Sequence, residues 1–137
     1  MKRRDFLWLA PAVLALPKAL WAADRVFYTP GLAEAAMKDG KVILLDFWTY
    51  WCTTCAAQDR VLADLRASTP AYDKAITFIT VDWDEYADSA LSKALKIPRR
   101  STLVALKGNV ELGRIVAGTA KAEIKALLDQ ALAAATA

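Results

Sequence analysis

The chain has 137 residues, which is enough for one domain with a single hydrophobic core. Its formal net charge of +3 comes from the first 23 residues, since residues 24–137 carry fourteen basic and fourteen acidic side chains. A domain without net charge does not favour nucleic acid or an anionic membrane surface as its partner.

The first 23 residues have the features of an export signal. They open with the twin-arginine pattern Met1-Lys2-Arg3-Arg4 and continue with an apolar stretch that two prolines and a lysine interrupt. The stretch is too short to span a membrane, and Ala22 and Ala23 offer a cleavage site. We predict a twin-arginine signal peptide over 1–23 and a periplasmic domain over 24–137 without stable membrane insertion. An uncleaved anchor or a docked helix is the alternative.

Strands and helices alternate along the rest of the chain. The predicted elements are a short strand at 26–28, a short helix at 31–38, a buried strand at 42–47, a helix from 53 or 54 to about 67, a second buried strand at 75–81, a helix at 88–96, a hairpin of strands 102–106 and 110–116, and a helix from about 120 to 132. Residues 131–137 predict a fraying alanine-rich tail. Alternation of this kind indicates an α/β fold, a central mixed sheet with helices on both faces.

Both cysteines of the chain lie in the segment Trp51-Cys52-Thr53-Thr54-Cys55, between the predicted strand 42–47 and the helix that follows. This places Cys52 at the start of a helix, where free backbone N–H groups and the helix dipole favour a thiolate. We therefore expect Cys52 to be a solvent-exposed nucleophile. Cys55, one turn later on the same face, can form a disulfide with Cys52 and release a bound substrate.

The alternatives are two buried structural thiols, a permanent disulfide, or half of a metal site. The chain has no histidine and no other cysteine, so a four-ligand zinc or iron–sulfur site within one chain lacks partners. A disulfide across so short a loop constrains the unfolded chain little. In an exported protein a redox pair is the better account, with the Cys52–Cys55 disulfide as the redox group and no cofactor or bound metal.

The segment Asp46-Phe47-Trp48-Thr49-Tyr50-Trp51-Cys52-Thr53-Thr54-Cys55 resembles the active-site segment of the thioredoxin family. The likeness covers about residues 42–132, including the hairpin, Gly118 and the last helix. It implies a thioredoxin-like fold and thiol–disulfide oxidoreductase activity on protein disulfides. It also implies that Trp51 packs beside the dithiol and that Asp46 is the family's buried acid, which helps to move a proton to or from Cys55.

Physical reasoning supports a special role for Asp46. A carboxyl group on a central strand is desolvated, which raises its pKa into a range useful for proton transfer. An aspartate that caps the active-site turn is the alternative. Thioredoxins often carry a lysine after the second central strand, where this chain has Thr80. The resemblance therefore leaves Asp46 without a charged partner.

The loop before the predicted strand 102–106 departs from the family pattern. Thioredoxins have a cis-proline directly before the threonine that opens this strand, and that register places Ser101 there, with Pro98 as an ordinary trans proline. A second register makes Pro98 the cis residue. We favour Ser101 in a reshaped trans loop, because a cis bond at a non-proline residue costs about 2.5 to 4 kcal/mol. Such a loop pairs with the substrate as an added strand, and Ser101 supplies an N–H that proline lacks.

Arg99 and Arg100 lie in the same loop. A guanidinium close to Cys52 would lower the pKa of its thiol and favour acidic substrates, whereas two solvated arginines are the alternative. The predicted substrate-binding residues are Trp51, Thr53, Thr54, Arg100 and Ser101.

The residues between the cysteines, Thr53 and Thr54, include neither the proline of cytosolic reductants nor the histidine of strong periplasmic oxidants. Without an imidazolium to stabilise the thiolate, the disulfide is expected to be a weaker oxidant. This favours a reductant or exchange role and implies an electron donor in the inner membrane. Two alternatives are a redox-inactive binding or chaperone module with this fold, and a dimer that shares a metal or iron–sulfur centre through Cys52 and Cys55.

Overall fold

The structure is a computed structural model that describes residues 25–137. The export signal predicted over 1–23 lies outside the described residues. In chain order the elements are α1 (Leu32–Lys38), β1 (Val42–Trp48), α2 (Thr53–Ser68), α3 (Ala71–Ala75), β2 (Thr77–Asp82), α4 (Trp83–Tyr86), α5 (Ala90–Ala94), β3 (Thr102–Lys107), β4 (Val110–Val116) and α6 (Lys121–Thr136).

Four strands form one mixed sheet in the order β2-β1-β3-β4. β1 is parallel to β2 and antiparallel to β3, and β3 and β4 form an antiparallel hairpin. The central place of β1 follows from its sequence, because a nearly continuous apolar strand is stable only when both of its faces are covered. The predicted α/β architecture, a mixed sheet with helices on both faces, is confirmed.

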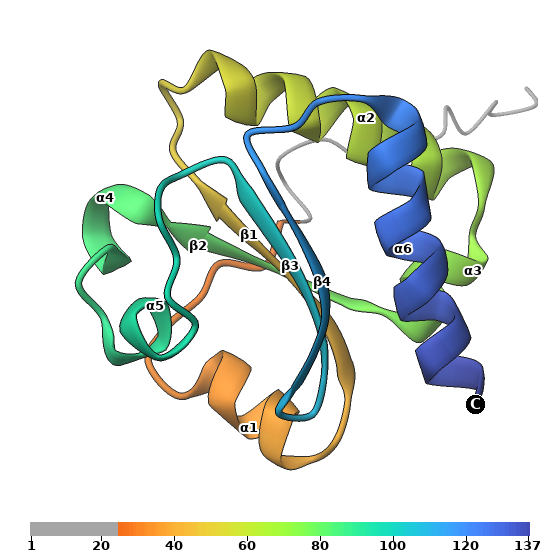
Figure 1. Ribbon diagram of the computed structural model, residues 1–137, viewed down its shortest axis with the longest axis horizontal. Helices are drawn as coiled ribbons and strands as arrows, with labels where there is room; N and C mark the ends of the chain where they lie inside the picture. The colour runs from red at the N-terminus through yellow and green to blue at the C-terminus, as the bar shows by residue number, and fades with distance from the viewer. Residues whose placement is uncertain (1–24) are drawn as a thin grey trace, which may run out of the picture.

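Different helices cover the two faces of the sheet (Figure 1). Alternate residues of a strand point to opposite faces. Even-numbered residues of β1, such as Val42 and Leu44, pack in a cluster with α2, α3 and α6, whereas odd-numbered residues, such as Ile43 and Phe47, pack in a cluster with α1 and α5. Asp46 shares the face of Val42 and Leu44, so it lies on the α2 side of the sheet.

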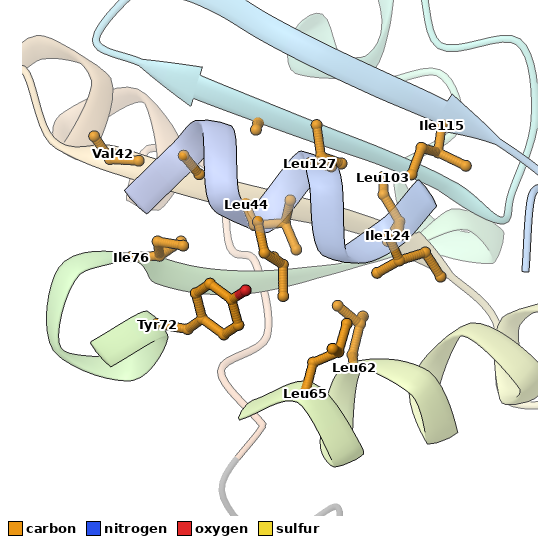
Figure 2. Packing of buried hydrophobic residues seen from close by; sticks show 13 residues of the cluster. Val42, Leu44, Leu62, Leu65, Tyr72, Ile76, Leu103, Ile115, Ile124 and Leu127 are labelled. Atoms are coloured by element: carbon orange, nitrogen blue, oxygen red, sulfur yellow. The ribbon is translucent and has the colours of Figure 1, made fainter. Parts of the chain in front are cut away.

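The core between the sheet and α2, α3 and α6 holds α2 in place (Figure 2). Helix α6 turns one apolar stripe toward the sheet, made of Ile124, Leu127, Leu128 and Ala131. Leu62 and Leu65 of α2 are buried in the same cluster. This packing fixes the helix whose N-cap and first turn carry the cysteines. No helix within residues 25–137 is long and apolar enough to cross a membrane.

Four segments differ from the pattern predicted from the sequence. Residues 26–28 join the sheet through a single bridge, from Phe27 to Thr80, and not as a full strand. Helices α3 and α4 have only five and four residues, too few to show a helical period in the sequence. Helix α6 continues to Thr136 in place of the expected fraying tail, because alanine is a strong helix former and Ala131 packs in the core.

Candidate active site

The two cysteines lie where β1 ends and α2 begins, at the carboxyl end of the central strand. Cys52 is the N-cap of α2, and its sulfur accepts a hydrogen bond of 3.2 Å from the backbone N–H of Cys55. The sulfur thus takes the place that a serine or aspartate oxygen usually fills. The placement at a helix start, predicted from the sequence, is confirmed, and it favours negative charge on Cys52.

Both thiols are more enclosed than expected. Cys52 is 5% exposed and Cys55 is 0% exposed, so the expectation of a freely exposed nucleophile is wrong. The reason is that the connection from α5 to β3 returns beside the β1–α2 connection (Figure 1). This brings Ser101 against both sulfurs. Cys52 is nevertheless the more accessible of the two, so an incoming disulfide reaches Cys52 first.

Ser101 meets the dithiol from the facing loop. Its hydroxyl oxygen lies 3.1 Å from the sulfur of Cys52 and 3.1 Å from the sulfur of Cys55. Of the two registers that the sequence allows, the geometry therefore favours Ser101 over Pro98 at the position facing the sulfurs. No peptide bond within residues 25–137 is cis, so this loop is trans, as predicted.

The backbone of Ser101 is engaged within the protein. Its N–H donates a 2.7 Å hydrogen bond to the carbonyl oxygen of Phe47, and its own carbonyl accepts a 2.8 Å bond from the N–H of Ala117. The N–H that Ser101 adds is therefore not free to pair with a substrate, because the reshaped loop turns it toward β1. Any strand-like pairing with a substrate must use other backbone groups of the loop.

Gln58 stabilises the same loop by hydrogen bonds, and it was not among the site residues predicted from the sequence. It follows Cys55 by three residues on α2 and is 0% exposed. Its side-chain nitrogen donates hydrogen bonds to the carbonyl oxygens of Ser101, at 3.0 Å, and Gly118, at 2.9 Å. A buried amide needs such partners. A lone glutamine at a core-facing helix position is the signal that could have identified it.

The two thiols differ in proton affinity. Burial by itself raises the pKa of Cys52, but hydrogen bonds from Cys55 and Ser101, with a further contribution from Arg100, lower it to about 7. Burial raises the pKa of Cys55 above that of an ordinary thiol, and its hydrogen bond to Cys52 raises it further. Near neutral pH a large share of Cys52 is thiolate while Cys55 keeps its proton.

Asp46 lies behind the dithiol, within β1. Burial raises its pKa to about 8, the negative charge of Asp59 raises it too, and Arg25 lowers it. The residue is 7% exposed, and its Oδ1 has no hydrogen-bond partner in the described part of the chain. Its place inside the strand, opposite Thr80, argues against a role as a turn cap. A carboxyl group of this kind fits proton transfer near neutral pH.

A charged partner for Asp46 comes from the start of the described chain. Arg25 Nη1 lies 3.6 Å from Asp46 Oδ2, and Arg25 Nη2 lies 2.9 Å from Asp59 Oδ2. Arg25 Nη1 also donates a 3.1 Å hydrogen bond to Thr80 Oγ1, and the guanidinium carbon lies 4.7 Å from the centre of the Trp48 ring. The expectation that Asp46 lacks a charged partner is wrong, because the bridge to β2 brings this distant segment beside the acid.

Trp51 and Arg100 form the rim of the site. Trp51 is 51% exposed, and its indole N–H donates a 2.8 Å hydrogen bond to Asp84 Oδ2. The guanidinium carbon of Arg100 lies 4.3 Å from the centre of the Trp51 ring, a cation–π contact. Arg99 is exposed and donates a hydrogen bond to the Arg100 carbonyl. Arg100 is therefore the arginine that approaches the dithiol.

The remaining predicted substrate-binding residues are in the first turn of α2. Thr53 is exposed and Thr54 is half-buried. Both lie between the two cysteines, so they border any disulfide that reaches Cys52. Within residues 25–137 no three histidine, cysteine, aspartate or glutamate side chains are grouped so as to hold a metal ion.

The raised pKa of Asp46 predicts that stability falls with increasing pH. The carboxyl has a pKa of 3.8 in its ordinary state and about 8 when folded, so the folded state binds more protons between these values. The contribution of Asp46 to the free energy of unfolding is therefore largest below about pH 4 and is lost as the pH rises through about 8. We expect Asp46→Asn to remove this slope and to be more stable than the wild type at pH 8, by on the order of a few kcal/mol. Urea denaturation across pH 4–9 measures it.

Arg25→Gln serves as the opposite variant in the same titration. Since Arg25 lowers the pKa of Asp46, its loss leaves the buried acid protonated to a higher pH. The slope should then extend further into the alkaline range. Identical slopes in the wild type and Asp46→Asn would show that Asp46 is not the group that titrates.

Comparisons with known proteins agree with this fold and site. The family model described as Thioredoxin matches residues 30–130. An H-type thioredoxin from Brassica campestris is 33% identical over 95 residues, which cover 69% of this chain and 72% of the relative. A thioredoxin from Echinococcus granulosus is 30% identical over 95 residues, which cover 69% of this chain and 82% of the relative.

Solved structures show the same architecture. The crystal structure of Trxlp from Edwardsiella tarda has a TM-score of 0.65 and 26% identity, and the match covers 75% of this chain and 97% of that one. Mitochondrial thioredoxin 3 from Saccharomyces cerevisiae, in its oxidised form, has a TM-score of 0.61 at 23% identity, over 77% of this chain and 94% of that one. The thioredoxin-like form of the α/β fold is therefore confirmed.

Proposed function

The chain belongs to the thioredoxin family and is a thiol–disulfide oxidoreductase; on that premise we propose that it reduces or exchanges disulfides of other proteins in the bacterial periplasm. In this proposal Cys52 is the nucleophile, Cys55 is the resolving thiol and Asp46 exchanges the proton of Cys55. Trp51, Thr53, Thr54, Arg100 and Ser101 border the bound substrate.

The observation that supports these roles most is the asymmetry of the two thiols. Cys52 caps α2 and is the more accessible sulfur, whereas Cys55 is fully buried, one turn further along the helix. The pKa of Cys52 is lowered to about 7 and that of Cys55 is raised. The more accessible thiolate attacks first, and the protonated thiol behind it reacts only after a mixed disulfide has formed.

The reaction proceeds in two exchanges. The Cys52 thiolate forms a bond to one sulfur of the substrate disulfide, and the other substrate sulfur leaves as a thiolate that takes a proton from water. Cys55 then gives its proton to the Asp46 carboxylate and attacks the Cys52 sulfur. The Cys52–Cys55 disulfide forms, the second substrate sulfur leaves as a thiolate that takes up a proton, and two electrons have passed from the protein to the substrate.

The direction of electron flow follows from how strongly the thiolate is stabilised. Reducing members of this fold class have a nucleophile pKa of about 7, whereas strong periplasmic oxidants reach about 3.5. Cys52, with a pKa of about 7 and no histidine in the chain, has the properties of the first group. This supports a reductant or exchange role.

The proposal of periplasmic export is supported by the twin-arginine opening and the interrupted apolar stretch of residues 1–23. A reductant in that compartment needs a supply of electrons, so an electron donor in the inner membrane is part of the proposal. Fractionation of cells that produce the full chain tests the location. Recovery of all the protein in the cytoplasm would contradict it.

The surroundings of Cys52 support protein disulfides with acidic flanks as substrates. Tyr50 is 80% exposed and Trp51 is 51% exposed, so both offer apolar surface beside the dithiol. Arg99 and Arg100 add positive charge on the facing loop. Complementary charge raises the rate at which acidic partners associate.

The reduction potential of the Cys52–Cys55 pair is the measurement that tests the function. Equilibration with glutathione buffers is expected to give a reduction potential of about −270 mV, as for reducing thioredoxins. A reduction potential of about −120 mV would indicate a strong oxidant and overturn the proposed direction of electron flow. Failure to form any disulfide would overturn the dithiol mechanism itself.

A further inference from the structure

We propose that Ser101 is a catalytic residue of the dithiol reaction, and that its one hydroxyl proton is donated to whichever of the two sulfurs carries the negative charge. The inference rests on the proposed function, since it assigns a role within the exchange between Cys52 and Cys55. Ser101 would then take part in the exchange reaction itself, in addition to bordering the bound substrate.

The hydroxyl of Ser101 is placed between the two sulfurs. Its oxygen lies 3.1 Å from Cys52 Sγ and 3.1 Å from Cys55 Sγ, and the residue is 0% exposed. Within residues 25–137 these two sulfurs are the only hydrogen-bond partners of the Ser101 hydroxyl. A hydroxyl has one proton to donate and two lone pairs to accept with. It can therefore donate to a thiolate of Cys52, or to a thiolate of Cys55 once Cys52 no longer carries the charge.

The backbone prevents this hydroxyl from moving away. The N–H of Ser101 bonds to Phe47 of β1, and its carbonyl accepts bonds from Ala117 and from the Gln58 side chain of α2. These partners hold Ser101 at a φ of +63°, a left-handed conformation that is costly for a residue with a side chain. Such conformations persist when the surroundings over-determine them, and they concentrate at functional sites.

The position of the charge changes during the reaction, and the hydroxyl can follow it. In the reduced protein Cys52 is the thiolate and receives bonds from Ser101 Oγ and from the Cys55 N–H. Once the Cys52 sulfur has bonded to the substrate, it no longer carries charge. When Cys55 gives its proton to the Asp46 carboxylate, the hydroxyl rotates and donates to the new thiolate. No proton is gained or lost by Ser101 over the cycle.

The test compares two variants that lack the hydroxyl, Ser101→Ala and Ser101→Gly. Glycine adopts a φ of +63° without strain, so at least one variant folds. A hydrogen bond to an ionised group is worth at least about a tenfold change in an equilibrium constant. At pH 6, where the thiolate is the minor form, we expect iodoacetamide to alkylate Cys52 about tenfold more slowly in both variants. The absorbance of the thiolate at about 240 nm should titrate at a correspondingly higher pH.

Ser92→Ala is the matched control. Ser92 is a buried serine, 2% exposed, whose hydroxyl bonds to the Tyr86 carbonyl at 2.7 Å and has no contact with the sulfurs. In this variant iodoacetamide should alkylate Cys52 at the wild-type rate. Wild-type rates in both Ser101 variants, or equal slowing in Ser92→Ala, would overturn the proposal. A wild-type protein whose Cys52 is inert would instead overturn the proposed function, so the two failures are distinguishable.

Discussion

Cys52→Ser is expected to abolish disulfide reduction, with a rate loss of at least about a thousandfold. The thiol of Cys52 has a pKa of about 7, so a large share of it is ionised near neutral pH, whereas a serine hydroxyl in its place stays protonated. Cleavage of a protein disulfide such as that of insulin, followed by turbidity with dithiothreitol as the electron source, measures the loss.

Cys55→Ser is the matched variant, because it keeps the nucleophile and removes only the resolving thiol. It should accumulate a mixed disulfide between Cys52 and the substrate, visible as a covalent complex without reductant and absent after reduction. Full activity in Cys52→Ser would contradict the dithiol mechanism and favour a binding module with a thioredoxin fold. A stable complex on Cys55 in place of Cys52 would reverse the two assigned roles.

Ser101→Pro is expected to destabilise the domain by about 3 kcal/mol or more, even though proline is the residue that thioredoxins carry at this position. Proline fixes φ near about −65°, whereas Ser101 has a φ of +63°. It also lacks the N–H that donates the 2.7 Å hydrogen bond to Phe47. Urea denaturation at neutral pH measures the loss.

Ser101→Gly is the control for Ser101→Pro in the same experiment. Glycine keeps the N–H and accepts a positive φ, so it should be close to the wild type in stability. Equal stability of the proline variant and the wild type would show that the loop tolerates the family's backbone. In that case Ser101 would be a simple substitution in an unchanged loop.

The active site is assembled from segments that lie far apart in the sequence. α2 and its N-cap contribute the cysteines and Gln58, β1 contributes Asp46, and the loop before β3 contributes Ser101. The segment before α1 adds Arg25, whose guanidinium lies between the carboxylates of Asp46 and Asp59. Because Arg25 lowers the pKa of Asp46 against the effect of burial, it keeps the acid in a range where it can accept a proton.

The local sequence pattern was enough to predict the main strands and helices of this protein. The run 42–47 is nearly continuously apolar, which fits a strand covered on both faces better than an exposed one, and the spacing of the two cysteines after it placed Cys52 at a helix start. The spacing of Ile124, Leu127 and Leu128 likewise marked the last helix. These features are determined by neighbours within about two helical turns, so the sequence alone was enough for them.

Contacts between distant segments were decided only by the tertiary structure. No local pattern relates Arg25 to Asp46, and the pairing arises because a single bridge lays residue 27 beside β2. The enclosure of Cys52, the place of Ser101 between two sulfurs and the hydrogen bonds of Gln58 depend in the same way on how the α5–β3 connection returns beside the start of α2. Proton affinities follow from burial and from nearby charges, and both exist only once the chain has folded.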